Sequence, residues 1–153
     1  METTIREYLS SDYNDCIEAF KSNVPDYFAS KEVQDFENFL ERIEKGKDNV
    51  RFFVVQYNQK VIGCGGFADM NDDSLFALAW GLIHKDFHGR GFGEKLLQHR
   101  IEQIRQINPE FSLIIDTTQY AKGFFEKHGF RTTKVTNDYY TIGMHRHDMI
   151  LQF

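Results

Sequence analysis

The sequence of 153 residues is poor in several residue types that mark particular protein classes. It has two cysteines, two prolines and one tryptophan, and 23 acidic side chains outnumber 18 basic ones, for a net charge of -5. Two cysteines without metal-binding or redox spacing argue against a secreted disulfide framework and favour free thiols inside the cell. The acidic balance argues against a general nucleic-acid binder, which needs a basic surface.

Long apolar runs are also missing. The longest, Leu75 to Ile83, covers about half of a membrane span, so we interpret it as a buried strand. The polar N-terminus lacks the apolar core of a signal peptide. We therefore expect a single cytoplasmic domain over residues 1–153, with no membrane or nucleic-acid partner and with a homodimer left open.

What the sequence does contain is a regular succession of apolar patterns. Alternating or continuous apolar residues predict strands, and apolar residues at helical spacing predict helices. Gly63, Gly65 and Gly66 suggest a bulge or a close backbone approach within their strand. The predicted strands are 3–9, 51–57, 60–68, 75–83 and 112–116; the predicted helices are 12–23, 31–46, 91–107 and 118–130; and a closing hairpin pairs 130–136 with 139–151 around Asn137 and Asp138.

The centre of this order is strand 75–83, a glycine turn, helix 91–107 and strand 112–116. A strand–helix–strand crossover places its two strands in parallel. The flanking strands are joined by short turns and pair in antiparallel fashion. The fold class is therefore α/β (α+β in some schemes), with a mixed, mostly antiparallel sheet flanked by helices.

The turn itself, "HGRGFG", carries glycines at 89, 91 and 93. A glycine turn that opens a helix presents free N–H groups and the positive end of the helix dipole, which favours phosphate. The spacing excludes both a Walker loop and a dinucleotide-binding fingerprint. The alternative is that these glycines only provide positive φ angles in a tight turn.

Together, the element order and this turn resemble the GNAT superfamily of acyl-CoA-dependent N-acetyltransferases. The family signature for the pyrophosphate is [Gln/Arg]-x-x-Gly-x-[Gly/Ala], between the fourth strand and the third helix. Here it is "HGRGFG", with His88 in place of Gln or Arg. The likeness covers nearly the whole chain and implies a pair of central parallel strands that splay apart.

A second block, "TQYAKGFFEKHGF", is similar to the family's Asn-x-x-Ala-x-x-Leu-Tyr-x-Lys-x-Gly-Phe. Thr118 stands at the Asn position, and Phe125 replaces the tyrosine that usually serves as the acid for the departing thiolate. Core packing is the alternative interpretation for Phe124 and Phe125. Tyr120, Tyr139, Tyr140 or solvent would then take over the acid's role.

The resemblance implies direct transfer of an acetyl group from acetyl-CoA, as co-substrate, to a primary amine of a small molecule or a protein. Pantetheine would pair with the exposed edge of strand 75–83, in a strand-addition mode. The turn would hold the pyrophosphate. The residues expected to bind the cofactor are Leu82, Ile83, His84, His88, Gly89, Arg90, Gly91, Phe92, Gly93, Thr118 and Phe124.

The catalytic base is less clear, because strand 75–83 offers no acid. The candidates are Asp69, Asp73, His145, His147 and Asp148, each of which could equally be a surface charge. The pKa of histidine suits a base, so His145 is the first choice, with Tyr120 as acid. No third ligand accompanies the two histidines, so we expect no metal.

The acceptor site is expected where the break between the first two helices meets the last hairpin. Asn23, Tyr27 and Phe28 come from the break, and Tyr140 and Arg146 from the hairpin. Acidic and aromatic walls would attract a cationic amine; the alternative is that these aromatics only seal the core. A longer acyl group, a hydroxyl acceptor or an inactive CoA-binding regulatory module also fits the turn.

Overall fold

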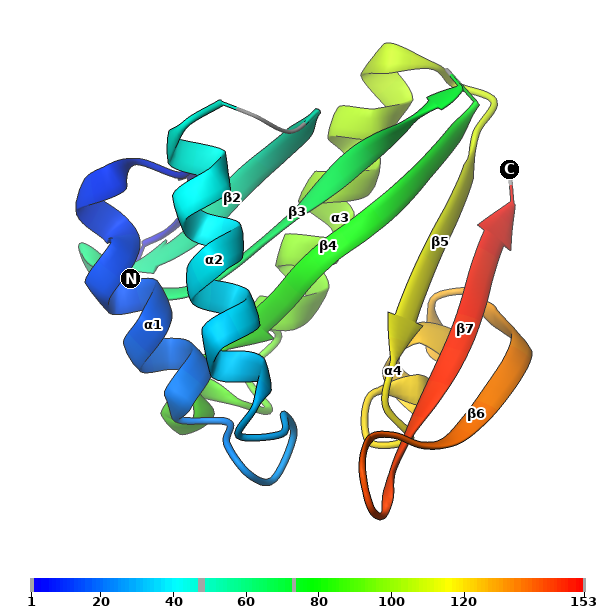
Figure 1. Cartoon of the computed structure of the whole chain (residues 1–153). Helices are drawn as coiled ribbons and strands as arrows, with labels where there is room; N and C mark the ends of the chain where they lie inside the picture. The colour runs from blue at the N-terminus through cyan, green and yellow to red at the C-terminus, as the bar shows by residue number, and fades with distance from the viewer. Residues whose placement is uncertain (1, 47–48, 73, 153) are drawn as a thin grey trace.

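A computed structural model describes residues 2–46, 49–72 and 74–152, which form one mixed sheet with helices on both faces (Figure 1). The strand order is β1-β2-β3-β4-β5-β7-β6. The strands are β1 (Thr3–Glu7), β2 (Val50–Tyr57), β3 (Lys60–Asp72), β4 (Leu75–Ile83), β5 (Ser112–Thr117), β6 (Arg131–Thr141) and β7 (Met144–Gln152). The helices are α1 (Tyr13–Lys21), α2 (Glu32–Glu44), α3 (Phe92–Ile107) and α4 (Lys122–Lys127), with short 3-10 turns at Ser10–Asp12 and Lys85–Phe87.

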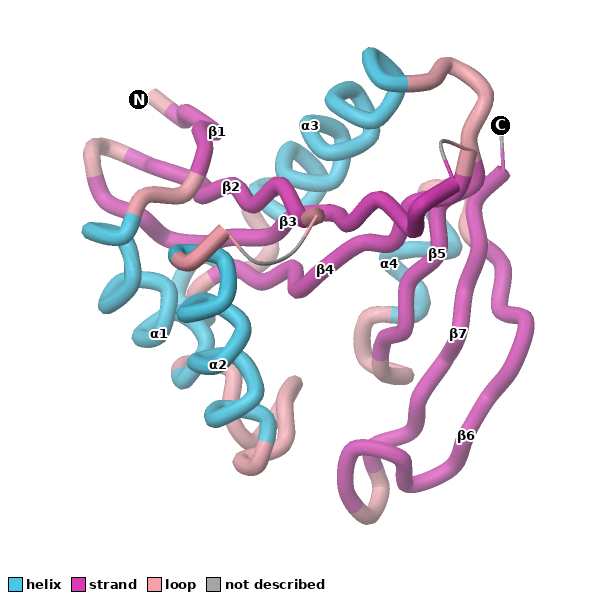
Figure 2. The backbone as a smooth tube through the Cα atoms, turned by 45° about the horizontal axis from the view of Figure 1, so that its top comes forward, coloured by secondary structure: helices cyan, strands magenta, loops and turns pink. Residues whose placement is uncertain are grey.

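Helices α1 and α2 cover one face of the sheet, whereas α3 and α4 cover the other (Figures 1 and 2). Each face buries its own apolar cluster. Phe20, Phe36 and Leu40 pack between α1, α2 and the sheet, and Phe76 and Leu97 belong to the cluster under α3. Within the described part of the chain, no helix has the length and apolar character of a membrane span.

The centre of the sheet is split. β4 and β5 are the parallel pair that the crossover predicts, and their ladder has only three rungs, from Leu75↔Ser112 to Ala77↔Ile114. Past these residues the two strands diverge, and the gap between their ribbons widens toward the start of α3 (Figure 1). All other neighbouring strands are antiparallel. The parallel pair is the one that the crossover predicts, and the splay is the one that the family resemblance implies.

A bulge interrupts β4 just beyond this ladder. Gly65 pairs with Gly81 and Gly66 pairs with Ala79, so Trp80 is the extra residue, with a φ of +44°. A Cβ on Gly65 would lie 2.7 Å from the Trp80 carbonyl oxygen, so only glycine fits there. This confirms the close backbone approach that the glycines predict, while the extra residue of this bulge lies in the partner strand β4.

The last hairpin differs from the prediction. Its turn was expected at Asn137 and Asp138, but β6 continues to Thr141 and the chain turns at Ile142 and Gly143. Gly143 adopts a φ of +84°, and its N–H donates to the Asp138 carboxylate at 2.7 Å. The Asn-Asp pair instead lies in an irregular stretch of β6, because the glycine satisfies the turn at lower steric cost. The predicted helix 118–130 is also shorter, since α4 spans only Lys122–Lys127.

Candidate active site

The glycine turn has the geometry of an anion site. Gly89 and Gly91 have φ angles of +74° and +85°, and Gly91 is the N-cap of α3. The first N–H groups of a helix have no partner within it, so they are free to bind an anion. A Cβ on either glycine would meet nothing within 4 Å, which leaves the turn open to a ligand. The turn therefore fits both interpretations made from the sequence, a phosphate site and a tight turn that needs positive φ angles. The glycines with positive φ are the same residues whose surroundings are open to a ligand.

Two side chains of the turn bind the protein itself. His88 Nε2 lies 2.8 Å from the Ile83 carbonyl oxygen, which ties the turn to the end of β4. Arg90 donates to the Tyr57 hydroxyl at 3.1 Å, and its guanidinium lies 5.2–5.6 Å from the ring centres of Tyr57, Phe87 and Phe92. The positive charge of Arg90 is thereby held beside β2.

The other side of the turn faces α4. Gly93 does not need a positive φ, but a Cβ there would already contact the Phe124 ring at 3.9 Å. Phe124 is only partly buried, whereas its neighbour Phe125 belongs to the core and is 7% exposed. Thr118 is buried just before α4 and accepts the Tyr120 amide at 3.3 Å. The structure thus brings three predicted cofactor contacts, Gly93, Thr118 and Phe124, to the same end of the split.

The predicted strand edge is partly occupied by protein groups. The His84 amide donates to the Ile62 carbonyl of β3, so the neighbouring Ile83 turns its amide and carbonyl the other way. That Ile83 carbonyl accepts from both Asn23 Nδ2 (3.0 Å) and His88. Asn23 also donates to the Ala19 carbonyl and is 2% exposed, so its amide fastens α1 to β4.

Tyr27, in the connection between α1 and α2, contacts two other predicted site segments, the glycine turn and the residues just before α4. Its ring is 5.3 Å from the His88 ring and 6.2 Å from the Tyr120 ring, both in edge-to-face geometry. The α1–α2 connection is thereby brought to both the glycine turn and the start of α4. The adjacent Phe28 stacks on Phe20 at 4.5 Å instead, inside the aromatic cluster beneath α1 and α2.

An acidic and aromatic pocket lies between the start of α2 and the ends of β5 and β6. Its volume is about 400 Å³, and it is lined by Lys31, Glu32, Asp35, Asp116, Tyr139 and Tyr140. Asp116 stands on β5 just past the last rung that β5 shares with β4. The pocket therefore opens beside the split, on the face that α1 and α2 cover.

Burial shapes the electrostatics of this pocket. Glu32 is 8% exposed, and its burial raises the pKa of the carboxyl, although the Ala29 amide donates to it at 2.8 Å. The nearby charges of Asp35 and Asp116 raise the pKa of Glu32 further. Burial, together with the charge of Asp116, also raises the pKa of Tyr140. The hydroxyl therefore stays protonated and can donate a hydrogen bond.

Arg146 lies on the pocket side of β7. Its Nε donates to Asp148 Oδ1 at 2.9 Å, and its guanidinium lies 4.7 Å from the centre of the Tyr139 ring. Asp148 pairs with Asp116 across β5 and β7, so the two carboxylates share one face of the sheet. Tyr140 and Arg146, both predicted to bind the acceptor, therefore belong to this region.

His145 and His147 lie on the opposite face of β7, toward α4. His145 Nδ1 accepts the Asp138 amide at 3.0 Å, and this contact supports the last hairpin. His147 is buried, and its pKa is lowered by that burial and by the nearby charge of Lys122. Of the other proposed bases, Asp69 pairs with Phe76 at the closed end of the split, and Asp73 lies outside the described residues. Across the described ranges, no group of three His, Cys, Asp or Glu side chains suits a metal ion.

Two residues of the pocket, Glu32 and Asp116, were not singled out from the sequence. The sequence did contain an indication for Asp116, because this residue directly follows the apolar run of β5. Polar residues at the end of a buried strand are often part of a functional site. Glu32 resembles any acidic residue in a first helical turn, and only the fold shows that it is buried in the pocket.

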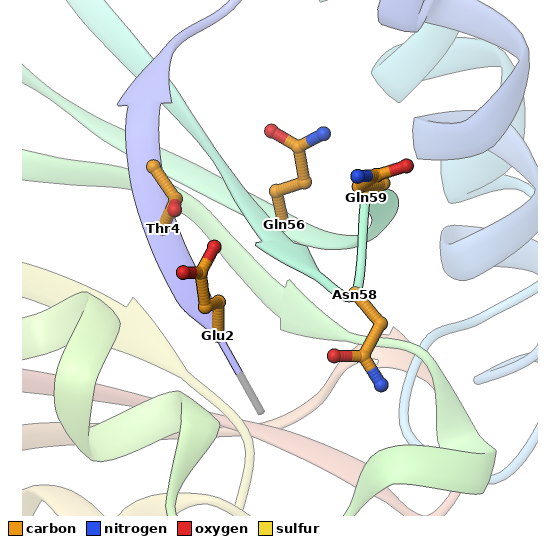
Figure 3. Close-up of a pocket in the computed structure, with 5 residues that line it drawn as sticks. All are labelled: Glu2, Thr4, Gln56, Asn58 and Gln59. Atoms are coloured by element: carbon orange, nitrogen blue, oxygen red, sulfur yellow. The ribbon is translucent and has the colours of Figure 1, made fainter.

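A second hollow, of about 620 Å³, lies at the β1 edge of the sheet (Figure 3). Polar side chains from the start of the chain through β1, from the end of β2 and from the β2–β3 turn line it: Glu2, Thr4, Gln56, Asn58 and Gln59. Strands β2 and β3 separate this edge from the split. The hollow shares none of the residues that the sequence predicts for the site.

Known proteins resemble the chain in sequence pattern and in fold. The family model described as an acetyltransferase (GNAT) domain matches residues 16–153. No curated protein sequence matches the chain significantly.

Several solved structures have the same fold. A GNAT-family acetyltransferase from Staphylococcus aureus Mu50 is 22% identical, with a TM-score of 0.80 and 99% of each chain covered. The ribosomal-protein-S18-alanine N-acetyltransferase from Escherichia coli is 16% identical, with a TM-score of 0.79, and 99% of this chain and 94% of that one are covered. The PaiA N-acetyltransferase from Thermoplasma acidophilum, in complex with coenzyme A, is 14% identical, with a TM-score of 0.74 over 100% of both chains. With its split sheet, its glycine turn and the family match, the chain belongs to the GNAT acetyltransferase family.

Proposed function

We propose that the protein transfers an acetyl group from acetyl-CoA to a primary amine of a small molecule or peptide. The observation that carries the proposal is the arrangement around the split between β4 and β5. An anion-binding turn lies at its wide end, and an acidic and aromatic pocket opens beside it. Family membership supports acetyl transfer, and the pocket supports a cationic acceptor.

The residues around the turn fit coenzyme A. The free amides of the turn from Gly89 to Gly93 would bind the pyrophosphate, because they offer donors and a helix dipole in open space. From Leu78 to Leu82, no strand that the structure describes pairs with β4 on its β5 side, so pantetheine amides can pair with that edge. The Ile83 carbonyl is not available to them, because Asn23 and His88 already bind it. Thr118 and Phe124 would border the pantetheine from the α4 side.

The pocket would bind the acceptor as an ammonium ion and help to deprotonate it. Asp116 and Glu32 supply negative charge, and the Tyr139 and Tyr140 rings supply cation–π surface. A buried carboxyl with a raised pKa, such as Glu32, is a suitable base for an ammonium ion.

The neutral amine nitrogen then attacks the thioester carbonyl carbon, and the carbonyl electron pair moves to oxygen. When this intermediate collapses, the C–S bond breaks and sulfur leaves with the electron pair as the thiolate. The second proton leaves the nitrogen for solvent, because Glu32 already holds the first. The thiolate needs little acid assistance, since the pKa of an alkyl thiol is about 8.5.

A specific observation favours a second candidate, a CoA-binding regulatory module without catalysis. Phe125 occupies the place of the usual tyrosine and is buried in the core, and β4 has no acidic residue. Tyr120, whose ring contacts Tyr27, is one of the predicted substitutes for that acid. Both candidates require CoA, and they differ only in turnover.

Two measurements separate these candidates. A thermal shift with acetyl-CoA and with CoA tests binding, and a thiol-release assay with polyamines, aminoglycosides, amino acids and peptides tests transfer. We expect stabilisation by both ligands and thiol release with at least one cationic amine. Stabilisation without release on any amine would favour the regulatory module, and no stabilisation would refute both.

We also propose that the protein is cytoplasmic and has no membrane partner. The acidic net charge supports the further proposal that it has no nucleic-acid partner.

A further inference from the structure

One buried positive charge is not used by the proposed reaction so far. Arg100 lies on α3 and is 3% exposed. Its Nη1 donates to the Gly66 carbonyl oxygen at 3.2 Å, while its buried Nε has no hydrogen-bond partner. Among the residues that the structure describes, no carboxylate forms an ion pair with it. Burial lowers the pKa of Arg100 to about 10, so the side chain stays charged at neutral pH.

The guanidinium of Arg100 lies directly behind the bulge of β4. A Cβ on Gly81 would be 3.0 Å from Nη2 and 3.2 Å from Nη1, so only glycine leaves room for the guanidinium. The carbonyl that Arg100 binds belongs to Gly66, the partner of Ala79. Arg100 therefore binds the β3 backbone opposite Ala79 and lies against Gly81, the residue that follows Trp80 in β4.

Stability does not account for this arrangement. A buried charge without a counter-charge costs several kcal/mol of desolvation, and well-packed apolar replacements of buried charges are often neutral or stabilising. The surroundings are apolar, since Leu96 and Leu97 are buried next to it on α3. A methionine is shorter by two atoms, but it is apolar and would occupy part of the same space without that cost.

We propose that Arg100 is a positioning residue of acetyl transfer, which fixes the β4 bulge and holds a positive charge behind the strand edge where the thioester reacts. The inference rests on the proposed function. At Gly81, β4 has already separated from β5, so this backbone faces the split. Negative charge forms there first on the carbonyl oxygen and then on sulfur, and a fixed positive charge in a low-dielectric interior stabilises both.

The test compares Arg100→Met, which removes the charge, with Arg100→Lys, which keeps it without the planar fork. For each protein we would measure the melting temperature, the Kd for CoA, and kcat and KM for acetyl-CoA with an amine on which the wild type is active. The pKa of the bound CoA thiol, followed by thiolate absorbance during a pH titration, gives a readout without turnover.

For Arg100→Met we expect an unchanged or higher melting temperature, a Kd for CoA within about threefold, and a kcat at least about tenfold lower. The pKa of the bound thiol should rise relative to the wild type, and Arg100→Lys should recover part of both effects. A kcat within about twofold of wild type, an unchanged thiol pKa, or a joint loss of stability and CoA binding would overturn the assignment. If the wild type binds CoA but releases no thiol with any amine, the proposed function has failed, and this inference fails with it.

Discussion

The Tyr140 hydroxyl donates to Asp116 Oδ2 at 2.7 Å and so joins β6 to the end of β5 inside the acidic pocket. The bond orients the carboxylate that we expect to face the acceptor. Since Tyr140 is 9% exposed, its ring also closes the pocket against Met144 and Ala29. One side chain thereby supports both the shape and the charge of the pocket.

Replacing Tyr140 by phenylalanine should keep the ring and remove this hydrogen bond. We expect a loss of about 1 kcal/mol in the free energy of unfolding and a higher KM for the amine, with the Kd for CoA unchanged. Urea unfolding and steady-state kinetics measure these quantities. Tyr13→Phe is the matched control, because it removes the hydroxyl of a half-buried tyrosine at the start of α1, outside the pocket, and it should alter none of them. Equal KM values for Tyr140→Phe and wild type would show that the hydroxyl does not orient the acceptor's partner.

The glycine turn is tested by a pair of variants that differ only in charge. Gly91→Asn and Gly91→Asp both tolerate the positive φ and can cap α3, and a side chain there meets open space. Asparagine should keep most of the CoA affinity, whereas aspartate should weaken it by at least about tenfold through repulsion of phosphate. Isothermal titration with CoA measures both affinities. Similar affinities for the two variants would mean that the pyrophosphate binds elsewhere.

Glu32 should lower the stability of the folded protein at neutral pH while supporting acetyl transfer. Burial raises its pKa in the folded state, so the folded protein holds the proton more tightly than the unfolded chain. The resulting stability is present at acidic pH and is lost as pH rises from the unfolded pKa through the folded pKa. Glu32→Gln can still accept the Ala29 amide, so it should melt higher than wild type at pH 7, and the difference should vanish below about pH 4.

The same variant should transfer acetyl groups more slowly, because it lacks the carboxylate that accepts the proton. Melting curves between pH 3 and pH 8 and thiol release at pH 7 measure the two effects. Asp35→Asn, which removes a carboxylate of the same wall that lies closer to solvent, should show a smaller difference in melting temperature. A Glu32→Gln variant as active as wild type would remove Glu32 from the list of bases.

Asp12 gives the opposite pH dependence. Burial opposes its ionisation, but hydrogen bonds from Arg6 (2.9 and 3.0 Å) and from the Leu9 amide (2.8 Å) outweigh burial and lower its pKa. The stability is therefore present above the unfolded pKa and is lost as pH falls through the folded pKa. Asp12→Asn should be less stable by about 2 kcal/mol at pH 7.

This difference should begin to shrink near pH 4, the ordinary value for aspartate, and should disappear at lower pH. Urea unfolding of wild type and variant at several pH values tests the prediction. Asp15→Asn, one turn further along α1, should change the free energy of unfolding by no more than about 0.5 kcal/mol. A pH-independent difference for Asp12→Asn would point to lost packing instead.

Much of the fold could be predicted because it depends on local patterns. The order of the elements follows from apolar periodicity, and the parallel β4–β5 pair follows from the crossover between them. The turn of the last hairpin could not be placed, since Asn137-Asp138 and Ile142-Gly143 both suit a turn and cross-strand packing decides between them. The length of α4 likewise depends on how Thr118 and Ala121 start the turn before it.

The two halves of the site differed in how far the sequence could predict them. The glycine turn is contiguous, so its spacing carries the geometry. The acidic and aromatic pocket joins α2, β5 and β6, and no local pattern shows that Glu32 and Asp116 line one cavity. The contacts of Asn23 and Phe28 could not be predicted either: the fold joins the buried Asn23 to the Ala19 carbonyl and stacks the half-buried Phe28 on Phe20.

The extra residue at Trp80 has a consequence for the whole strand. Side chains of a strand alternate between its faces, so Leu78, which packs under α3, would place Leu82 under α3 as well and Ile83 under α1. The observed order is reversed, with Leu82 beside α1 and Ile83 beside Phe92 of α3. The bulge thus shifts the alternation of side chains along β4 by one residue. Deleting one residue there would exchange the faces of the sheet to which Leu82 and Ile83 point, while leaving the composition of the strand almost unchanged.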